Sequence, residues 1–236
     1  MTTPSSDSQP ALPTMEEMSA RYDRFVVDLF GVMAYGELSA FERMSSDARY
    51  SPTLHDRAVL GRMAVAEFEH YETVSGALAE AGVDAEAAML PFQPSVDSFH
   101  DRTRPADWYE SMMKAYVIDA ISNDFYQAIS EYLDPASRSV IARIRTSDET
   151  QRILQDRIRV ALADDPRLAS RLALWGRRLV GEALTQAQRV GIERAFLGGL
   201  LGSGESAEES TALVRELMAT LTKAHSKRMS QLGLTA

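Results

Sequence analysis

Glu67 and His70 could hold a metal ion together, because a carboxylate and an imidazole stand three residues apart in a segment with helical periodicity. Residues i and i+3 lie on one face of an α-helix, so both side chains can reach one ion. Glu37 offers a third donor from the middle of the apolar face of an earlier segment. A buried carboxylate is costly unless it is paired or bound to a cation. These residues predict a metal site between two helices; an exposed, metal-free Glu-x-x-His pair is the alternative.

Two later segments also carry polar residues on apolar faces. Asp119 stands on one of them, and Asp148 and Gln151 stand on the next. A bundle that holds two metal ions uses a second Glu-x-x-His pair, but here those positions are Asp148 and Gln151. Oxygen ligands combined with imidazole suit iron or manganese. The sequence therefore predicts one or two iron ions, with manganese as the alternative, and the following ligands: Glu37, Glu67, His70, Asp119 and Asp148.

Long helices must position these residues, because apolar residues recur at helical spacing through most of the chain and no strand pattern competes. We expect helices over 15–44, 54–81, 107–133, 135–163, 167–197 and 207–232. The segment 82–105 contains three prolines and shows no period. A connection of that length can travel the whole length of a bundle.

The predicted fold is therefore an all-α four-helix bundle with one long crossover and two additional C-terminal helices. We expect a disordered tail over 1–14, which is rich in Ser, Thr and Pro, and a bundle over 15–197. A C-terminal helix over 207–232 would pack on the bundle or extend from it.

Composition excludes several classes of protein. The chain has 236 residues and no cysteine, so disulfides and thiolate metal sites are absent. No apolar run is long enough to span a membrane, and the N-terminal residues lack the features of a secretory signal. These features predict a cytoplasmic protein that does not enter a membrane.

The net charge of −9 is unevenly distributed. Residues 1–137 carry 9 Lys/Arg and 23 Asp/Glu, whereas residues 138–200 carry 12 and 7. The arginines of the second stretch could bind phosphate. The alternative, which we favour, is that they are solvated or pair with the acidic half.

The motif Met33-Ala34-Tyr35-Gly36-Glu37, the Glu67/His70 pair and Asp119 together resemble ferritin-like proteins of actinobacterial type. The chain is also similar, over residues 171–184 in particular, to the tRNA methylthio-isopentenyl-adenosine hydroxylases. The resemblance covers residues 23–194. It implies a nonheme diiron centre that activates dioxygen, although the fourth helical segment lacks the Glu-x-x-His of that family.

Two functions remain open on the sequence. The first is an oxygen-activating hydroxylase or oxidase that acts on a small molecule or on tRNA, with tRNA docking on the arginine-rich segments. The second is a non-catalytic ferritin-like bundle that serves as a structural or partner-binding protein. Either protein could form a homodimer through its last two helices.

Overall fold

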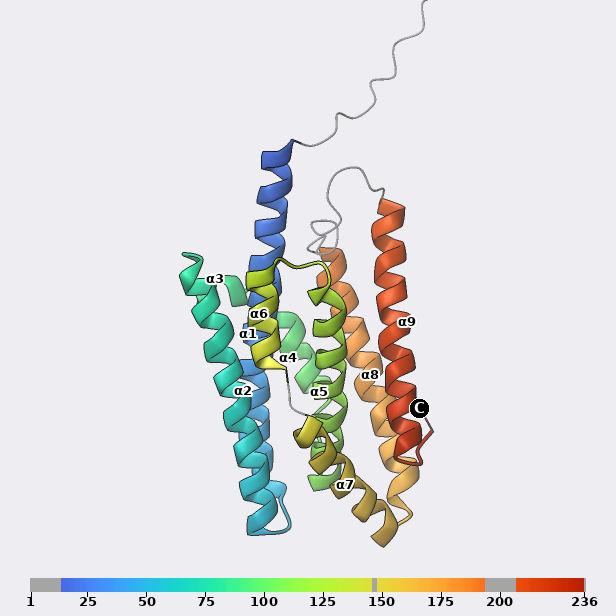
Figure 1. Cartoon of the computed structure of the whole chain (residues 1–236). Coiled ribbons are helices and arrows are strands. Elements are labelled where there is room, and N and C mark those ends of the chain that lie inside the picture. The colour runs from blue at the N-terminus through green and yellow to red at the C-terminus, as the bar shows by residue number, and fades with distance from the viewer. Residues whose placement is uncertain (1–13, 146–147, 194–206, 236) are drawn as a thin grey trace, which may run out of the picture.

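A computed structural model describes residues 14–145, 148–193 and 207–235 of the chain (Figure 1). Within these residues every regular element is helical: α1 (Met15–Asp47), a 3-10 turn (Ala48–Tyr50), α2 (Leu54–Glu80), α3 (Ala85–Met89), α4 (Gln93–Arg102), α5 (Trp108–Ser130), α6 (Pro135–Ile144), α7 (Asp148–Asp164), α8 (Leu168–Glu193) and α9 (Ala207–Gln231). The predicted tail lies, apart from Thr14, outside the described residues. None of the helices described is both long and apolar enough to cross a membrane.

The helices form the predicted bundle. Helix α1 packs along α2, α6 packs on α2, and α5 contacts α1, α6 and α7. The core of four therefore consists of α1, α2, α5 and the α6–α7 pair (Figure 1). Helices α8 and α9 pack on α5 and on each other, so they form an additional C-terminal layer. The prediction of an all-α bundle with two further C-terminal helices is confirmed.

Helices α1 and α5 run in opposite directions. Tyr126 of α5 donates a hydrogen bond to Glu37, near the middle of α1. Ser111 of α5 donates one to Asp47, which stands ten residues later on α1. The residue number therefore falls along α5 as it rises along α1. This orientation places the early part of α5 beside the late part of α1.

Capping residues explain where the long helices begin. Thr14 and Glu17 form a capping box at the start of α1. The carboxylate of Asp107 accepts hydrogen bonds from two backbone N–H groups at the start of α5. At the end of α2, Gly82 adopts a φ of +74°, which glycine tolerates without a steric penalty.

The connection 82–105 joins α2 to α5 as the predicted long crossover, but it is not aperiodic, since it contains α3 and α4. Both helices are too short to show a clear period in the sequence, and Pro94 stands in the first turn of α4, where proline is tolerated. Helix α3 packs closely on α1 at Gly31. A Cβ atom at Gly31 would lie 2.2 Å from the carbonyl oxygen of Ala88, so only glycine permits this approach.

The helix predicted over 135–163 is divided. Helix α6 ends at Ile144, Arg145 is extended with φ −70° and ψ 125°, and α7 begins at Asp148. Ser147 directly precedes two acidic residues in the sequence, a combination that favours a helix start and that the prediction overlooked. The division matters for the site because Gln151 stands on α7, in its first turn.

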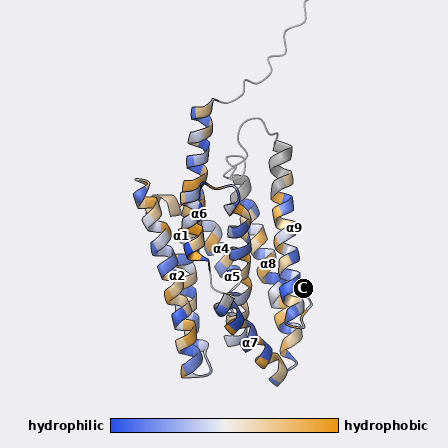
Figure 2. Ribbon diagram, in the orientation of Figure 1, coloured by the Kyte–Doolittle hydropathy of each residue, from blue (hydrophilic) through white to orange (hydrophobic). Residues whose placement is uncertain are grey.

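Helix α5 is buried on all sides over its first half, where it is enclosed by α7, α8 and α9 as well as by α1. Seven consecutive residues, 111–117, are buried. The indole N–H of Trp175 on α8 donates to the Glu110 carbonyl oxygen at 2.9 Å. Other helices carry hydrophobic and hydrophilic residues side by side, as amphipathic helices do (Figure 2).

Candidate metal centre

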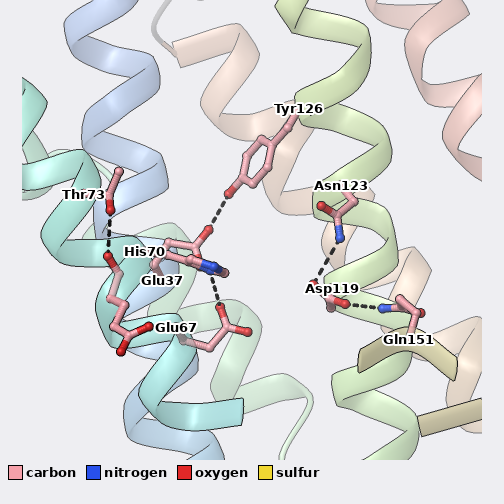
Figure 3. Close-up of polar contacts among 9 residues, drawn as sticks. Glu37, Glu67, His70, Thr73, Asp119, Asn123, Tyr126 and Gln151 are labelled. Atoms are coloured by element: carbon pink, nitrogen blue, oxygen red, sulfur yellow. Dashed lines mark hydrogen bonds and ion pairs between the residues drawn. The ribbon is translucent and has the colours of Figure 1, made fainter. Parts of the chain in front are cut away.

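Glu37, Glu67 and His70 come together in the structure. Glu37 projects from the middle of α1, and Glu67 and His70 project from one face of α2, three residues apart. Because α1 and α2 pack along each other, the three side chains converge between them (Figure 3). Among the described residues this is the only group of three potential metal-binding side chains whose ligand atoms all lie within 4.8 Å of one another.

The imidazole of His70 lies between the two carboxylates. Its Nδ1 atom is 3.5 Å from Glu37 Oε2 and 3.6 Å from Glu67 Oε2. The side chains are only 15% exposed for His70, 8% for Glu37 and 12% for Glu67. Within the described part of the chain, no Lys or Arg side chain forms an ion pair with either carboxylate.

Burial and proximity shift the pKa values of this group. Burial raises the pKa of Glu67, and the neighbouring Glu37 carboxylate raises it further. Burial alone would lower the pKa of His70, but its hydrogen bonds to Glu37 and Glu67 outweigh burial and raise it. Two carboxylates therefore share a region with low solvent exposure, and positive charge between them is favoured.

This donor set fits a divalent transition metal. Two carboxylates and one imidazole provide hard oxygen donors with a nitrogen donor, the combination that suits iron or manganese. A cation at the point of convergence would remove the repulsion between Glu37 and Glu67. The chain has no cysteine, so it lacks the thiolate ligands that softer metals prefer.

Tyr126 on α5 fixes the orientation of Glu37. Its hydroxyl donates to Glu37 Oε1 at 3.0 Å, which leaves Oε2 directed toward His70 (Figure 3). Burial raises the pKa of Tyr126 well above its usual value, and the nearby Glu37 charge adds to this effect. The phenol therefore keeps its proton and acts as a hydrogen-bond donor.

Asp119 lies outside the group of three. Its carboxylate accepts a hydrogen bond from the side-chain amide of Gln151 on α7, and another from Asn123 at 3.2 Å (Figure 3). Asp148, the remaining predicted ligand, begins α7, but its side chain is not among those that the structure describes. The structure thus brings together three of the five predicted ligands and connects Asp119 to Gln151 instead.

A cavity of about 160 Å³ adjoins the metal centre between α1, α4 and α5. Glu37, Glu67, Asp119 and Tyr126 line one part of it. Much of the remaining wall is apolar, with contributions from the following side chains: Met44, Leu60, Val96, Phe99 and Ile118. A second hollow of about 370 Å³ between α2 and α7 also reaches Glu67 and His70. The centre is therefore approached from two directions.

The far part of the first cavity contains polar residues that the sequence analysis missed. Arg43, Lys114 and His100 line it, together with Asp47 and Ser111. Lys114 donates to the Thr103 carbonyl oxygen at 2.9 Å and lies 3.2 Å from His100 Nδ1. A sequence signal existed, because Lys114 is a single charged residue within the apolar run 112–118.

Comparisons with known proteins agree with this architecture. The sequence matches a family described as "Ferritin-like domain, actinomycetes" over residues 20–204. No curated protein matches the chain.

Among solved structures, a Synechococcus protein with aldehyde deformylating oxidase activity superposes with a TM-score of 0.67 at 19% identity, covering 93% of this chain and 94% of its own. A candidate class I ribonucleotide reductase from Bacillus halodurans gives a TM-score of 0.63 at 12% identity, covering 93% and 84%. At these identities the structures support the fold alone, and they confirm the prediction of a ferritin-like bundle.

Proposed function

Because the chain belongs to the actinomycete ferritin-like domain family, we propose that it is a metal-dependent oxidoreductase that binds iron at Glu37, Glu67 and His70 and activates dioxygen. The observation that carries this proposal is the convergence of these three donors, with little solvent exposure, beside an internal cavity. Iron held by these residues would supply the redox chemistry toward dioxygen. Manganese is the alternative ion for the same donors.

The chain's own residues would prepare the site for that chemistry. Tyr126 holds Glu37 in place through its hydrogen bond, so this carboxylate keeps one oxygen directed toward the imidazole. The apolar cavity wall limits the access of water to a bound substrate. His70 and Glu67, which also border the second hollow, offer a route for small molecules that does not cross the substrate cavity.

We infer that the protein holds one ion rather than two. The amides of Gln151 and Asn123 satisfy the carboxylate of Asp119 without a cation. The second half of a two-ion site would need Asp119 together with Asp148, and no second imidazole stands on α7.

A small-molecule substrate fits the site better than tRNA. The cavity beside the metal centre lies among buried side chains. Several arginines of the basic region pair with acidic residues. Arg157 lies 3.1 Å from Asp56, and Arg171 lies 2.6 Å from Asp107. These pairs support the view that the arginines balance the acidic half. Hydroxylation of tRNA therefore rests on the sequence resemblance alone.

A non-catalytic bundle is the second candidate. It is favoured by the Asp119–Gln151 contact, in which a neutral amide donates to the carboxylate in place of metal coordination in half of the expected site. Such a protein would keep the fold for a structural or partner-binding role.

Oxygen consumption separates these functions. Ferrous iron is added anaerobically to the metal-free full-length protein, and dioxygen uptake is then followed with an electrode. We expect uptake above that of free iron for the wild type and for His55→Ala, whose exposed histidine lies at the start of α2. His70→Ala should lose this uptake. Equal rates for wild type and His70→Ala would exclude the proposed oxidase.

A further inference from the structure

The cavity beside the metal centre ends at two cationic side chains that retain unused hydrogen-bond donors. Lys114 is only 8% exposed, and an ammonium group has three N–H donors. Two of these have partners, the Thr103 carbonyl oxygen and His100 Nδ1. Arg43 Nε is buried and has no hydrogen-bond partner among the described residues. Both side chains line the same cavity.

Buried cationic groups with unsatisfied donors are costly, unless an anion binds to them. The charges at this end of the cavity leave room for one negative charge. Among the residues that line this end of the cavity, Arg43 and Lys114 contribute two positive charges and Asp47 contributes one negative charge. Asp101, which also acts on Lys114 from α4, is exposed and does not line the cavity. His100 stays neutral, because burial and the two cations lower its pKa to about 3. A single carboxylate would balance the remaining positive charge.

The position of the cations relative to the metal centre defines how such a ligand would lie. Arg43 follows Glu37 by six residues on α1, which corresponds to about 9 Å along the helix axis. Apolar side chains line the same cavity, including Met44, Leu60 and Ile118. A cavity of about 160 Å³ is comparable to one that accommodates a benzene-sized molecule.

We propose that this cavity binds a small monocarboxylate, with its carboxylate on Arg43 and Lys114 and its apolar body directed toward Glu37, Glu67 and His70. This proposal rests on the proposed function in one respect only, namely that the bound monocarboxylate is the substrate of the metal centre. Two other ligands share part of this chemistry. A phosphate monoester would also bind the cations, and a neutral hydrocarbon would also fill the apolar part, so both are outcomes of the binding experiment.

Binding to the metal-free full-length protein tests the cationic end independently of any oxidase activity. Benzoate, benzamide and phenyl phosphate are each titrated into the protein and followed by calorimetry. We expect benzoate to bind and benzamide, which has the same shape without the charge, to bind roughly tenfold to hundredfold more weakly. Equal binding of benzoate and benzamide, tighter binding of phenyl phosphate, or no benzoate binding at millimolar concentration would overturn the proposal.

Two substitutions assign the carboxylate to its partners. Lys114→Met and Arg43→Met keep most of the side-chain volume but remove the charge. Each should weaken benzoate binding roughly tenfold or more and leave benzamide binding unchanged. Arg24→Met, at an exposed position on the same helix as Arg43, is the matched control and should bind benzoate like the wild type. If either variant does not fold, the other carries the test. Benzoate affinity equal to that of the wild type in a folded Lys114→Met or Arg43→Met would overturn the assignment.

The orientation of the ligand is measured with manganese in the metal centre. The paramagnetic ion broadens the proton resonances of bound benzoate according to their distance from it. We expect the para proton, opposite the carboxylate, to relax faster than the ortho protons. The reverse order would mean that the carboxylate binds the metal itself, which would overturn the proposed orientation. Metal content is measured on the same samples, so a protein that binds benzoate but no metal would refute only the oxidase function.

Discussion

Gln151 on α7 donates a hydrogen bond from its side-chain amide to the carboxylate of Asp119 on α5. In a bundle that holds two metal ions, the helix at the position of α7 provides a metal-binding Glu-x-x-His pair. Here the neutral amide occupies that place, and Asn123 provides a second amide donor to the same carboxylate. Asp119 is therefore satisfied without a cation, which separates the two halves of the expected site.

The first prediction concerns metal content. The full-length protein should bind one ion of iron or manganese per chain, as measured by elemental analysis after gel filtration. His70→Ala should remove this ion, because the imidazole is the one nitrogen donor of the group of three. His55→Ala, at an exposed position, should retain it. Two ions per chain in the wild type would show that Asp119 and Asp148 also bind metal.

The second prediction follows from the Gln151–Asp119 contact. Gln151→Glu places a second carboxylate beside Asp119 and removes its amide donor. Like charges in a partly buried site repel each other, so we expect a loss of roughly 1–3 kcal/mol in the free energy of unfolding near neutral pH. Added manganese should restore part of this stability in the variant, as measured by thermal unfolding. A variant as stable as the wild type without metal would show that the contact contributes little.

The third prediction concerns the packing of α3 on α1. Gly31→Ala should destabilise the protein by about 1–3 kcal/mol, since the new methyl group would overlap the Ala88 carbonyl oxygen and force the helices apart. Gly36→Ala on the same helix meets no atom within 4 Å. It should be neutral or stabilising by roughly 0.5–1 kcal/mol, because alanine favours helix. Chemical denaturation measures both, and equal stabilities would contradict the close packing.

The fourth prediction is the pH dependence of carboxylate binding. Burial lowers the pKa of Lys114 to about 8, against the opposing effect of Asp47. The cationic form binds the carboxylate, so affinity for benzoate should be constant below this pKa and fall as pH rises above it. The charged and titratable groups facing Lys114 are Arg43 and Asp47 from α1, and His100 and Asp101 from α4.

Calorimetric titrations between pH 6 and pH 10 measure this effect. Lys114→Met should bind weakly and show no such fall across the range, which assigns the dependence to that ammonium group. A fall that persists in the variant would assign it to another residue.

The sequence predicted the elements that carry strong local signals. Helices α1, α2 and α5 begin close to the predicted positions, since threonine or aspartate caps precede them. Glu37, Glu67 and His70 were recognised because they interrupt apolar stripes at helical spacing. These signals lie within one segment and do not depend on how distant segments pack.

The rest required the tertiary structure. Helices α3 and α4 have 5 and 10 residues, too few for a clear period. The partner of Asp119 could not be found because the hydrogen bond joins α5 to α7, and no local pattern shows which side chains of two separate helices meet. Arg43 and Lys114 converge from α1 and α5, two helices far apart in the sequence. Lys114 differed only as a single charge in an apolar run, and no pattern distinguished Arg43, because exposed arginines outnumber buried ones in proteins.

The enclosure of α5 has a consequence for biosynthesis. Its outer face packs against α8 and α9, which follow it in the chain. At ordinary translation rates roughly 5–20 s separate the completion of α5 from that of α9. During this interval the nascent chain carries a central helix with an uncovered apolar side, a surface that chaperones recognise and that promotes aggregation. All three proposed metal ligands are therefore synthesised well before α8 and α9 can cover the hydrophobic core.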